Sequence, residues 1–123
     1  MKLSNAIIYD VATKLRANFP QDGDMSMPIK LYFYLQKNIE VLFNAASEID
    51  KSRLLIAKTY GTLNPENNVY DIPPDQIERA SNELRDLFEL EQELPIHMFK
   101  LEDFEGLEFT FAQMNALMLM IEE

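Results

Sequence analysis

The chain has 123 residues, of which 47% are hydrophobic and 26% are charged, a composition typical of one ordinary globular domain spanning residues 1–123. Its formal net charge is −10, and it has no cysteine, which excludes a disulfide scaffold, a cysteine nucleophile and a thiolate metal site. No apolar run approaches the roughly 18 residues of a membrane span, and the N-terminus lacks the pattern of a secretory signal. We therefore expect a cytoplasmic protein with no membrane partner.

The first predicted element is a helix over residues 4–17, where apolar residues recur at every fourth position. Pro20 ends this helix, and residues 20–24 have the composition of a turn. A second, much longer helix is predicted to begin near Pro28, because proline is tolerated in the first turn of a helix.

An apolar ladder between Tyr32 and Tyr60 is the clearest pattern in the chain. Its steps alternate between four and three residues, and its apolar rungs are Tyr32, Leu35, Ile39, Leu42, Ala46, Ile49, Ile56 and Tyr60. At about 1.5 Å per residue, these positions make a helix of about 45 Å. Further apolar residues lie off the ladder, so we expect neighbours on two faces or a second copy of the chain. Arg53, the polar rung, either extends to the rim or pairs with an acid from the C-terminal half.

A short β-ribbon or an ordered loop is predicted next, over residues 62–72, because a turn of Asn, Pro and Glu separates two short apolar segments. Gly61 ends the long helix before it. We expect the ribbon to pair with a second extended segment, residues 92–101, where polar and apolar residues alternate.

Two further helices are predicted in the second half of the chain. The third helix opens at Asp75, because Asp75 and Glu78 have the spacing of a capping box. The last helix covers residues 110–122 and opens with a second capping box, Thr110 and Gln113. The predicted fold is therefore α+β and mainly α, with a long central helix, three shorter helices and a small β-ribbon or hairpin.

The charges divide the chain into a neutral half and an acidic half. Residues 1–74 hold eight acidic and eight basic residues, whereas residues 75–123 hold thirteen of the 21 acids but only three of the 11 bases. Since no basic patch is present, we predict no direct binding of nucleic acid. An acidic face can instead bind a basic protein surface. The alternative is that the acidic residues only keep the protein in solution.

The predicted partner-binding residues all lie in the acidic half. The charged ones are Glu89, Glu91, Glu93, Glu102, Asp103 and Glu105. Leu119 and Met120 are added because they lie off the main apolar stripe of the last helix, where exposure would make them an interface patch. The alternative for these two residues is packing in the core.

No catalytic, cofactor or metal site is predicted. His97, the only histidine, lies in an apolar run without the spacing of a catalytic triad, so a structural role is preferred. The three glycines are isolated and cannot form a phosphate-binding loop. Glu102, Asp103 and Glu105 are close enough in sequence to bind a hard cation, but a solvated surface is the preferred interpretation. We therefore expect a protein that is not an enzyme and needs no cofactor.

Three stretches of the chain carry a resemblance to a known group of proteins. They are the helix end at 54–61, the segment 70–72 with the helix end at 82–87, and the acidic segment 89–101 with the helix start at 109–114. From Leu54 onward the chain resembles small proteins of unknown function encoded by tailed phages and prophages of Gram-positive bacteria. The resemblance implies a phage setting and supplies no catalytic residues.

Two functional hypotheses follow from the charge and the resemblance. The first is a phage accessory protein of the host-cell cytoplasm, which inhibits or modulates a basic protein partner through an acidic surface. A nucleic-acid-handling host defence protein, such as a nuclease, is the partner class that the charge favours. The second is a structural or assembly protein of the phage particle, which forms a homo-oligomer through the ladder and the aromatic cluster Tyr32–Tyr34.

Overall fold

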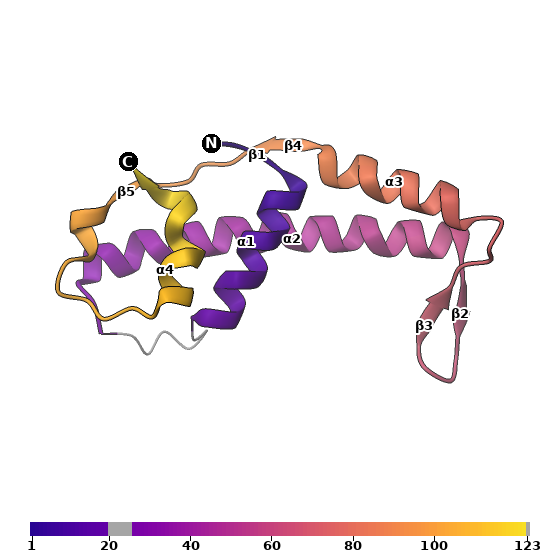
Figure 1. Ribbon diagram of the computed structural model, residues 1–123, viewed down its shortest axis with the longest axis horizontal. Helices are drawn as coiled ribbons and strands as arrows, with labels where there is room; N and C mark the ends of the chain where they lie inside the picture. Colours follow the sequence, from indigo (N-terminus) through magenta and orange to yellow (C-terminus); the bar gives the residue numbers. More distant parts are fainter. Residues whose placement is uncertain (20–25, 123) are drawn as a thin grey trace.

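A computed structural model of the chain describes residues 1–19 and 26–122 (Figure 1). These residues form four α-helices and three short strand pairs, so the predicted mainly helical α+β fold is confirmed. The turn predicted over residues 20–24 lies outside the described residues.

Helix α2, Ile29–Tyr60, runs almost the whole length of the molecule, as the ladder predicts (Figure 1). Pro28 precedes it, at a position where the missing N–H of proline costs no hydrogen bond within the helix. The helix ends at Gly61, whose N–H donates to the Ala57 carbonyl oxygen at 2.8 Å. A side chain at position 61 would collide with backbone, because a Cβ atom there would lie 2.9 Å from that same oxygen.

The hydrophobic core surrounds the N-terminal half of α2. Helix α1, Asn5–Asn18, crosses α2 near its middle, and helix α4, Phe111–Leu117, lies beside α1 (Figure 1). The most deeply buried apolar side chains come from these three helices and the turn after α4: Ile8, Leu15, Leu35, Leu42, Ile49, Leu117 and Met120. The first half of the ladder therefore packs within the chain.

Packing within the chain also covers most of the aromatic cluster Tyr32–Tyr34. Tyr34 stacks on His97 with the ring centroids 4.1 Å apart, and the edge of the Phe33 ring meets Tyr34. Phe33 is exposed, whereas Tyr32 and Tyr34 are partly buried. One of the five large residues from Leu31 to Leu35 is thus left in solvent, as their helical positions require.

The predicted ribbon is present as a hairpin. Strand β2, Thr62–Asn64, pairs antiparallel with strand β3, Val69–Asp71, with Leu63 opposite Tyr70. Asn68, which has a φ of 58°, occupies the left-handed region in the turn, a conformation that asparagine tolerates better than most residues.

The expected pairing of this ribbon with residues 92–101 is wrong. Strand β4, Glu91–Glu93, pairs instead with strand β1, Lys2–Ser4, in antiparallel register. Strand β5, Phe99–Lys100, pairs in parallel with strand β6, Ile121–Glu122. The 13 residues of α3 carry the chain about 20 Å back along α2 before β4 begins, so the ribbon is out of reach.

Helix α3, Ile77–Glu89, lies along the C-terminal half of α2 (Figure 1). The capping box predicted from Asp75 and Glu78 is wrong, because the helix begins after Gln76 and has no side-chain cap. In α4 the predicted box is confirmed: the Gln113 N–H donates to Thr110 Oγ1 at 3.1 Å. Helix α4 nevertheless ends at Leu117, where a short 3-10 turn follows in place of the predicted helix to residue 122.

Candidate interaction surface

The molecule divides into a packed core and a projecting arm. We define the arm as residues 50–89, which comprise the end of α2, the β2–β3 hairpin and α3 (Figure 1). Among these residues, all of which the structure describes, Ala80 is the only one that is buried. Two helices side by side cannot cover one another on all sides, so both faces of the arm remain open.

One face of the arm is an apolar groove between α2 and α3, with a volume of about 400 Å³. Its apolar walls come from both helices and from the segment before α3: Leu54, Ile56, Ile72, Ile77, Ala80 and Leu84. Leu54 is 47% exposed and Ile77 is 50% exposed, although both are large aliphatic residues. We call this surface the arm groove.

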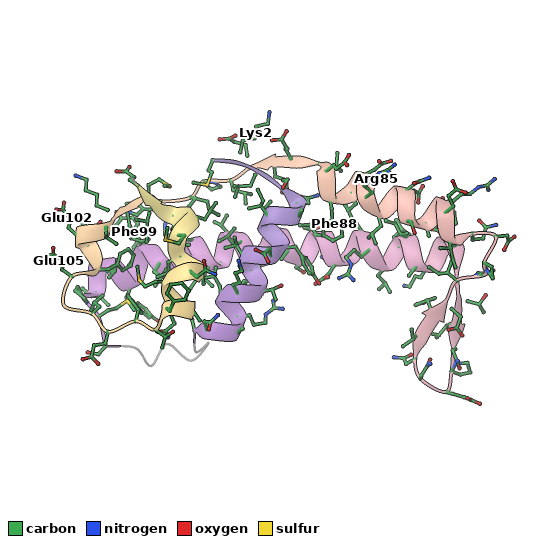
Figure 2. All side chains as sticks on the ribbon, viewed as in Figure 1. Lys2, Arg85, Phe88, Phe99, Glu102 and Glu105 are labelled. Carbon is green, nitrogen blue, oxygen red and sulfur yellow. The ribbon has the colours of Figure 1, made fainter. Side chains whose placement is uncertain are left out.

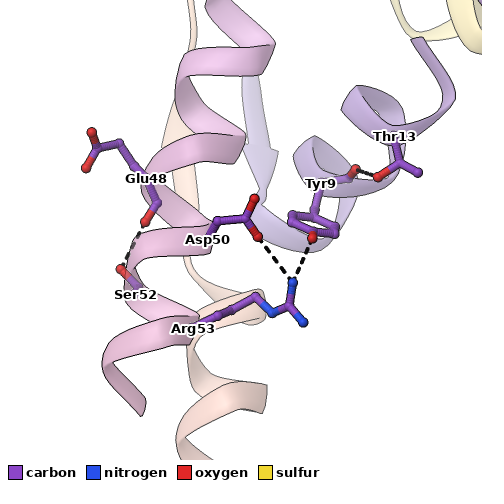
Figure 3. A network of polar contacts seen from close by, with 6 residues as sticks. All are labelled: Tyr9, Thr13, Glu48, Asp50, Ser52 and Arg53. Atoms are coloured by element: carbon purple, nitrogen blue, oxygen red, sulfur yellow. Dashed lines mark hydrogen bonds and ion pairs between the residues drawn. The ribbon is translucent and has the colours of Figure 1, made fainter. Parts of the chain in front are cut away.

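The arm groove is closed at the core end by Arg53 and Tyr9. Arg53 Nη1 donates to the Tyr9 hydroxyl at 2.7 Å and pairs with Asp50 Oδ1 at 3.2 Å (Figure 3). The Tyr9 ring also meets the edge of Phe88, with the ring centroids 5.8 Å apart. The acid that pairs with Arg53 therefore comes from the preceding turn of α2, and the alternative of an acid from the C-terminal half is wrong.

A second surface is acidic and lies at the core end of the arm, where α3 meets β4. Glu48, Ile49 and Ser52 of α2 line it, and none of these residues lines the groove. Leu90 stands exposed at 60% in this area, beside the partly buried Leu87. We call this area, together with Asp86, Glu89, Glu91 and Glu93, the junction surface.

Asn5 holds the junction surface against the core. Its side-chain nitrogen donates to the Leu87 carbonyl oxygen at 2.9 Å, and its side-chain oxygen accepts from Gln92 Nε2 at 2.7 Å. The Asn5 backbone N–H donates to the Leu90 carbonyl oxygen at 2.8 Å. These bonds explain why a polar residue is buried at the start of α1.

The six acidic residues proposed as partner-binding are all exposed, but they form two separate groups. Glu89, Glu91 and Glu93 belong to the junction surface, where Glu93 pairs with the N-terminal amine at 2.9 Å. Figure 2 places Glu102 and Glu105 at the end of the molecule that lies away from α3.

The second acidic group is not arranged as a metal site. One of its members, Asp103, accepts a hydrogen bond from the Lys100 backbone N–H at 2.8 Å and thereby caps a 3-10 turn, residues 101–104. Within the part of the chain that the structure describes, no three acidic or histidine side chains are grouped as metal ligands. Because this group lies at the other end of the molecule from the junction surface, the two acidic groups do not form one continuous surface.

The apolar patch expected at Leu119 and Met120 is not present. Met120 is fully buried and Leu119 is partly buried, because the 3-10 turn after Leu117 rotates these residues relative to a continuing α-helix. Met118 is exposed in their place.

His97 has surroundings that suit a structural role. Its ring stacks on Tyr34 and meets the edge of Phe99, with the ring centroids 4.8 Å apart. The side chain of Asn38 forms hydrogen bonds with both the backbone N–H and the backbone carbonyl oxygen of His97. Asn38 lies on α2 and is 1% exposed. The ring therefore belongs to an aromatic stack at the surface of the core.

Tyr60, in the last turn of α2, is the residue of the arm with a perturbed pKa. Partial burial raises the pKa of its hydroxyl, and a hydrogen bond and negative charge from Glu83 raise it further, whereas Arg79 acts in the opposite direction. Glu83 lies on α3, so the raised pKa of Tyr60 depends on the neighbouring helix.

Sequence reasoning missed the arm groove. The available signal in the sequence was the apolar stripe of α3, which is wide enough to contact two neighbours. The stripe contains Ile77, Ala80, Leu84, Leu87 and Phe88. A stripe shows which face of a helix is apolar, but the number of elements that cover this face depends on the fold.

No family model, curated protein or solved structure matches this chain significantly. The geometry of the chain itself is therefore the basis for a functional proposal. None of the helices in the described ranges is both long and apolar enough to cross a membrane.

Proposed function

We propose that the chain is a non-enzymatic phage accessory protein, which binds a protein partner and inhibits or modulates it. Its recognition surface is the junction surface, which carries four exposed carboxylates and the exposed side chain of Leu90. A surface of this kind combines an apolar anchor with charges that attract a basic partner.

The main support for this proposal is that most of these carboxylates form no ion pair with another described residue of the chain. Among the described residues, Glu93 is the only one of the four acids that takes part in an ion pair, whereas Asp86, Glu89 and Glu91 take part in none. Neighbouring carboxylates repel one another, so a basic surface that binds there relieves repulsion and gains attraction. Proteins that handle nucleic acid carry such surfaces.

A pull-down experiment with matched variants tests this proposal. The tagged chain is incubated with a lysate of a Gram-positive bacterium at low and at high salt, and the bound proteins are quantified by mass spectrometry. We expect a basic partner that binds at low salt and is lost with the double variant Glu89→Gln/Glu91→Gln, because both charges at the junction are removed.

The matched control is the double variant Glu102→Gln/Glu105→Gln. It changes the net charge by the same amount at the other end of the molecule, so we expect it to retain the partner. Equal loss with both double variants, or binding that does not change with salt, would contradict recognition at the junction surface.

A further inference from the structure

The arm groove differs from the rest of this acidic chain because its charges balance. The two charged residues that line it, Asp50 and Arg53, form an ion pair with each other. The groove is thus an apolar face without net charge on a chain whose net charge is −10.

Balanced charge matters most when a surface meets an identical surface. A two-fold axis brings each residue opposite its counterparts, so an acidic face repels its own copy. The junction surface, with its four carboxylates, is excluded from self-association for this reason. The arm groove carries no such penalty, because the two charges that line it already cancel within each copy.

We propose that the arm groove is the interface between two copies of this chain. The α2–α3 pair of one protomer packs on the same pair of its partner, so that four helices enclose the exposed halves of Leu54 and Ile77. This arrangement supplies a further apolar neighbour for the part of α2 and α3 that extends beyond α1. Ala80 and Ser81 are small residues that allow helices to approach closely.

The size of the groove face sets the expected strength of the dimer. Two helices about 20 Å long and about 9 Å apart give a face about 20 Å wide, so the dimer buries roughly 1,000 Å² in total. This area is at the lower end for specific interfaces, which predicts a dissociation constant on the order of micromolar.

The dimer leaves the junction surface free. No described residue lines both surfaces, and the junction surface lies beyond Leu84, at the core end of the groove. Each dimer would therefore present two acidic junction surfaces. The dimer does not depend on the function proposed above, but it would make such a protein bivalent.

Sedimentation equilibrium over a series of concentrations tests the dimer. We expect the wild-type chain to shift from monomer to dimer as the concentration rises through the micromolar range, and Leu54→Gln and Ile77→Gln to weaken this dimer at least tenfold. Leu55→Gln is the matched control: Leu55 is the neighbouring residue and is 64% exposed, but it lies outside the groove. We expect this control to dimerise as the wild type does.

Cross-linking gives a second measurement that does not depend on destabilising the interface. The chain has no cysteine, so Ser81→Cys introduces one thiol in the groove and Ser52→Cys introduces one thiol at the junction surface. We expect a short bis-maleimide to join two copies of Ser81→Cys and not two copies of Ser52→Cys.

Three outcomes would overturn the inference. If the chain stays monomeric at every concentration, the groove is not an interface between two copies. A dimer that Leu55→Gln weakens as much as Leu54→Gln would lie on another face. Cross-linking of Ser52→Cys in preference to Ser81→Cys would place the interface at the junction surfaces.

Discussion

Asn38 binds both backbone groups of His97. The His97 N–H donates to Asn38 Oδ1, and Asn38 Nδ2 donates to the His97 carbonyl oxygen, each at 2.8 Å. One buried amide side chain thus replaces the strand that the segment between β4 and β5 lacks. The same nitrogen lies 3.4 Å from Met120 Sδ, so Asn38 also contacts the turn after α4.

We expect Asn38→Ala to lower the free energy of unfolding by about 2–4 kcal/mol, because two buried backbone groups lose their partner. Chemical denaturation measures this change. Asn44→Ala, an exposed position of the same helix, is the control and should change stability by less than about 0.5 kcal/mol. Similar losses in both variants would contradict a special role for the Asn38–His97 contact.

Asn5→Ala should loosen the junction surface while leaving the fold intact. The variant removes the side-chain bonds to Leu87 and Gln92, which we expect to cost about 1–2 kcal/mol. Hydrogen exchange should become faster in β4 than in the β2–β3 hairpin, because Asn5 contacts the strand and not the hairpin. Asn82→Ala, on the exposed side of α3, serves as the control. Unchanged exchange in β4 would argue against this contact.

Gly61→Ala should destabilise the arm through a collision with backbone. The new Cβ atom would lie 2.9 Å from the Ala57 oxygen and 3.0 Å from the Asp71 oxygen, so the hairpin must shift, at a cost of about 1–3 kcal/mol. Amide hydrogen exchange should become faster in β2 and β3, because these strands open more often in the variant.

Gly106→Ala is an instructive comparison for Gly61→Ala. Gly106 has open space around it but a φ of 80°, so its substitution costs about 1–2 kcal/mol through backbone strain alone. Its effect should stay near the turn at residue 106. Faster exchange in the hairpin of this variant would contradict the collision as the specific cause at Gly61.

The arm should become less stable at alkaline pH because of Tyr60. Its folded pKa is raised above the usual value of about 10, so the stability it contributes is complete below about pH 10 and is lost as the pH rises through the folded pKa. The ionised hydroxyl would be partly buried and would face the Glu83 carboxylate. Ultraviolet difference absorbance should show one tyrosine that ionises late, and Tyr60→Phe should remove this signal.

Glu83→Gln separates the two causes of the raised Tyr60 pKa. It removes the negative charge but leaves the partial burial, so the late ionisation should move to lower pH without reaching the value of a free tyrosine. A titration curve identical to that of the wild type would show that Glu83 does not act on Tyr60.

Much of the secondary structure could be predicted from local patterns. The ladder predicts α2 nearly to its last residue, and the capping pair Thr110–Gln113 marks the start of α4. The asparagine-rich turn predicts the β2–β3 hairpin. These features depend on neighbours in sequence, so a local pattern is sufficient. The start of α3 was placed wrongly, because acids at capping spacing do not cap unless the backbone turns to meet them.

The sequence by itself determined the helices, the hairpin and the acidic character of the second half of the chain. Only the tertiary structure decided which strand pairs with which, that Met120 is buried, and that the arm carries an apolar groove next to the acidic junction surface. The physical reason is that periodicity records which side of an element is apolar. Coverage of that side depends on where the chain returns, and α3 returns along the C-terminal half of α2, where, among the described residues, α1 contacts it only at the core end, for instance through Tyr9 and Phe88.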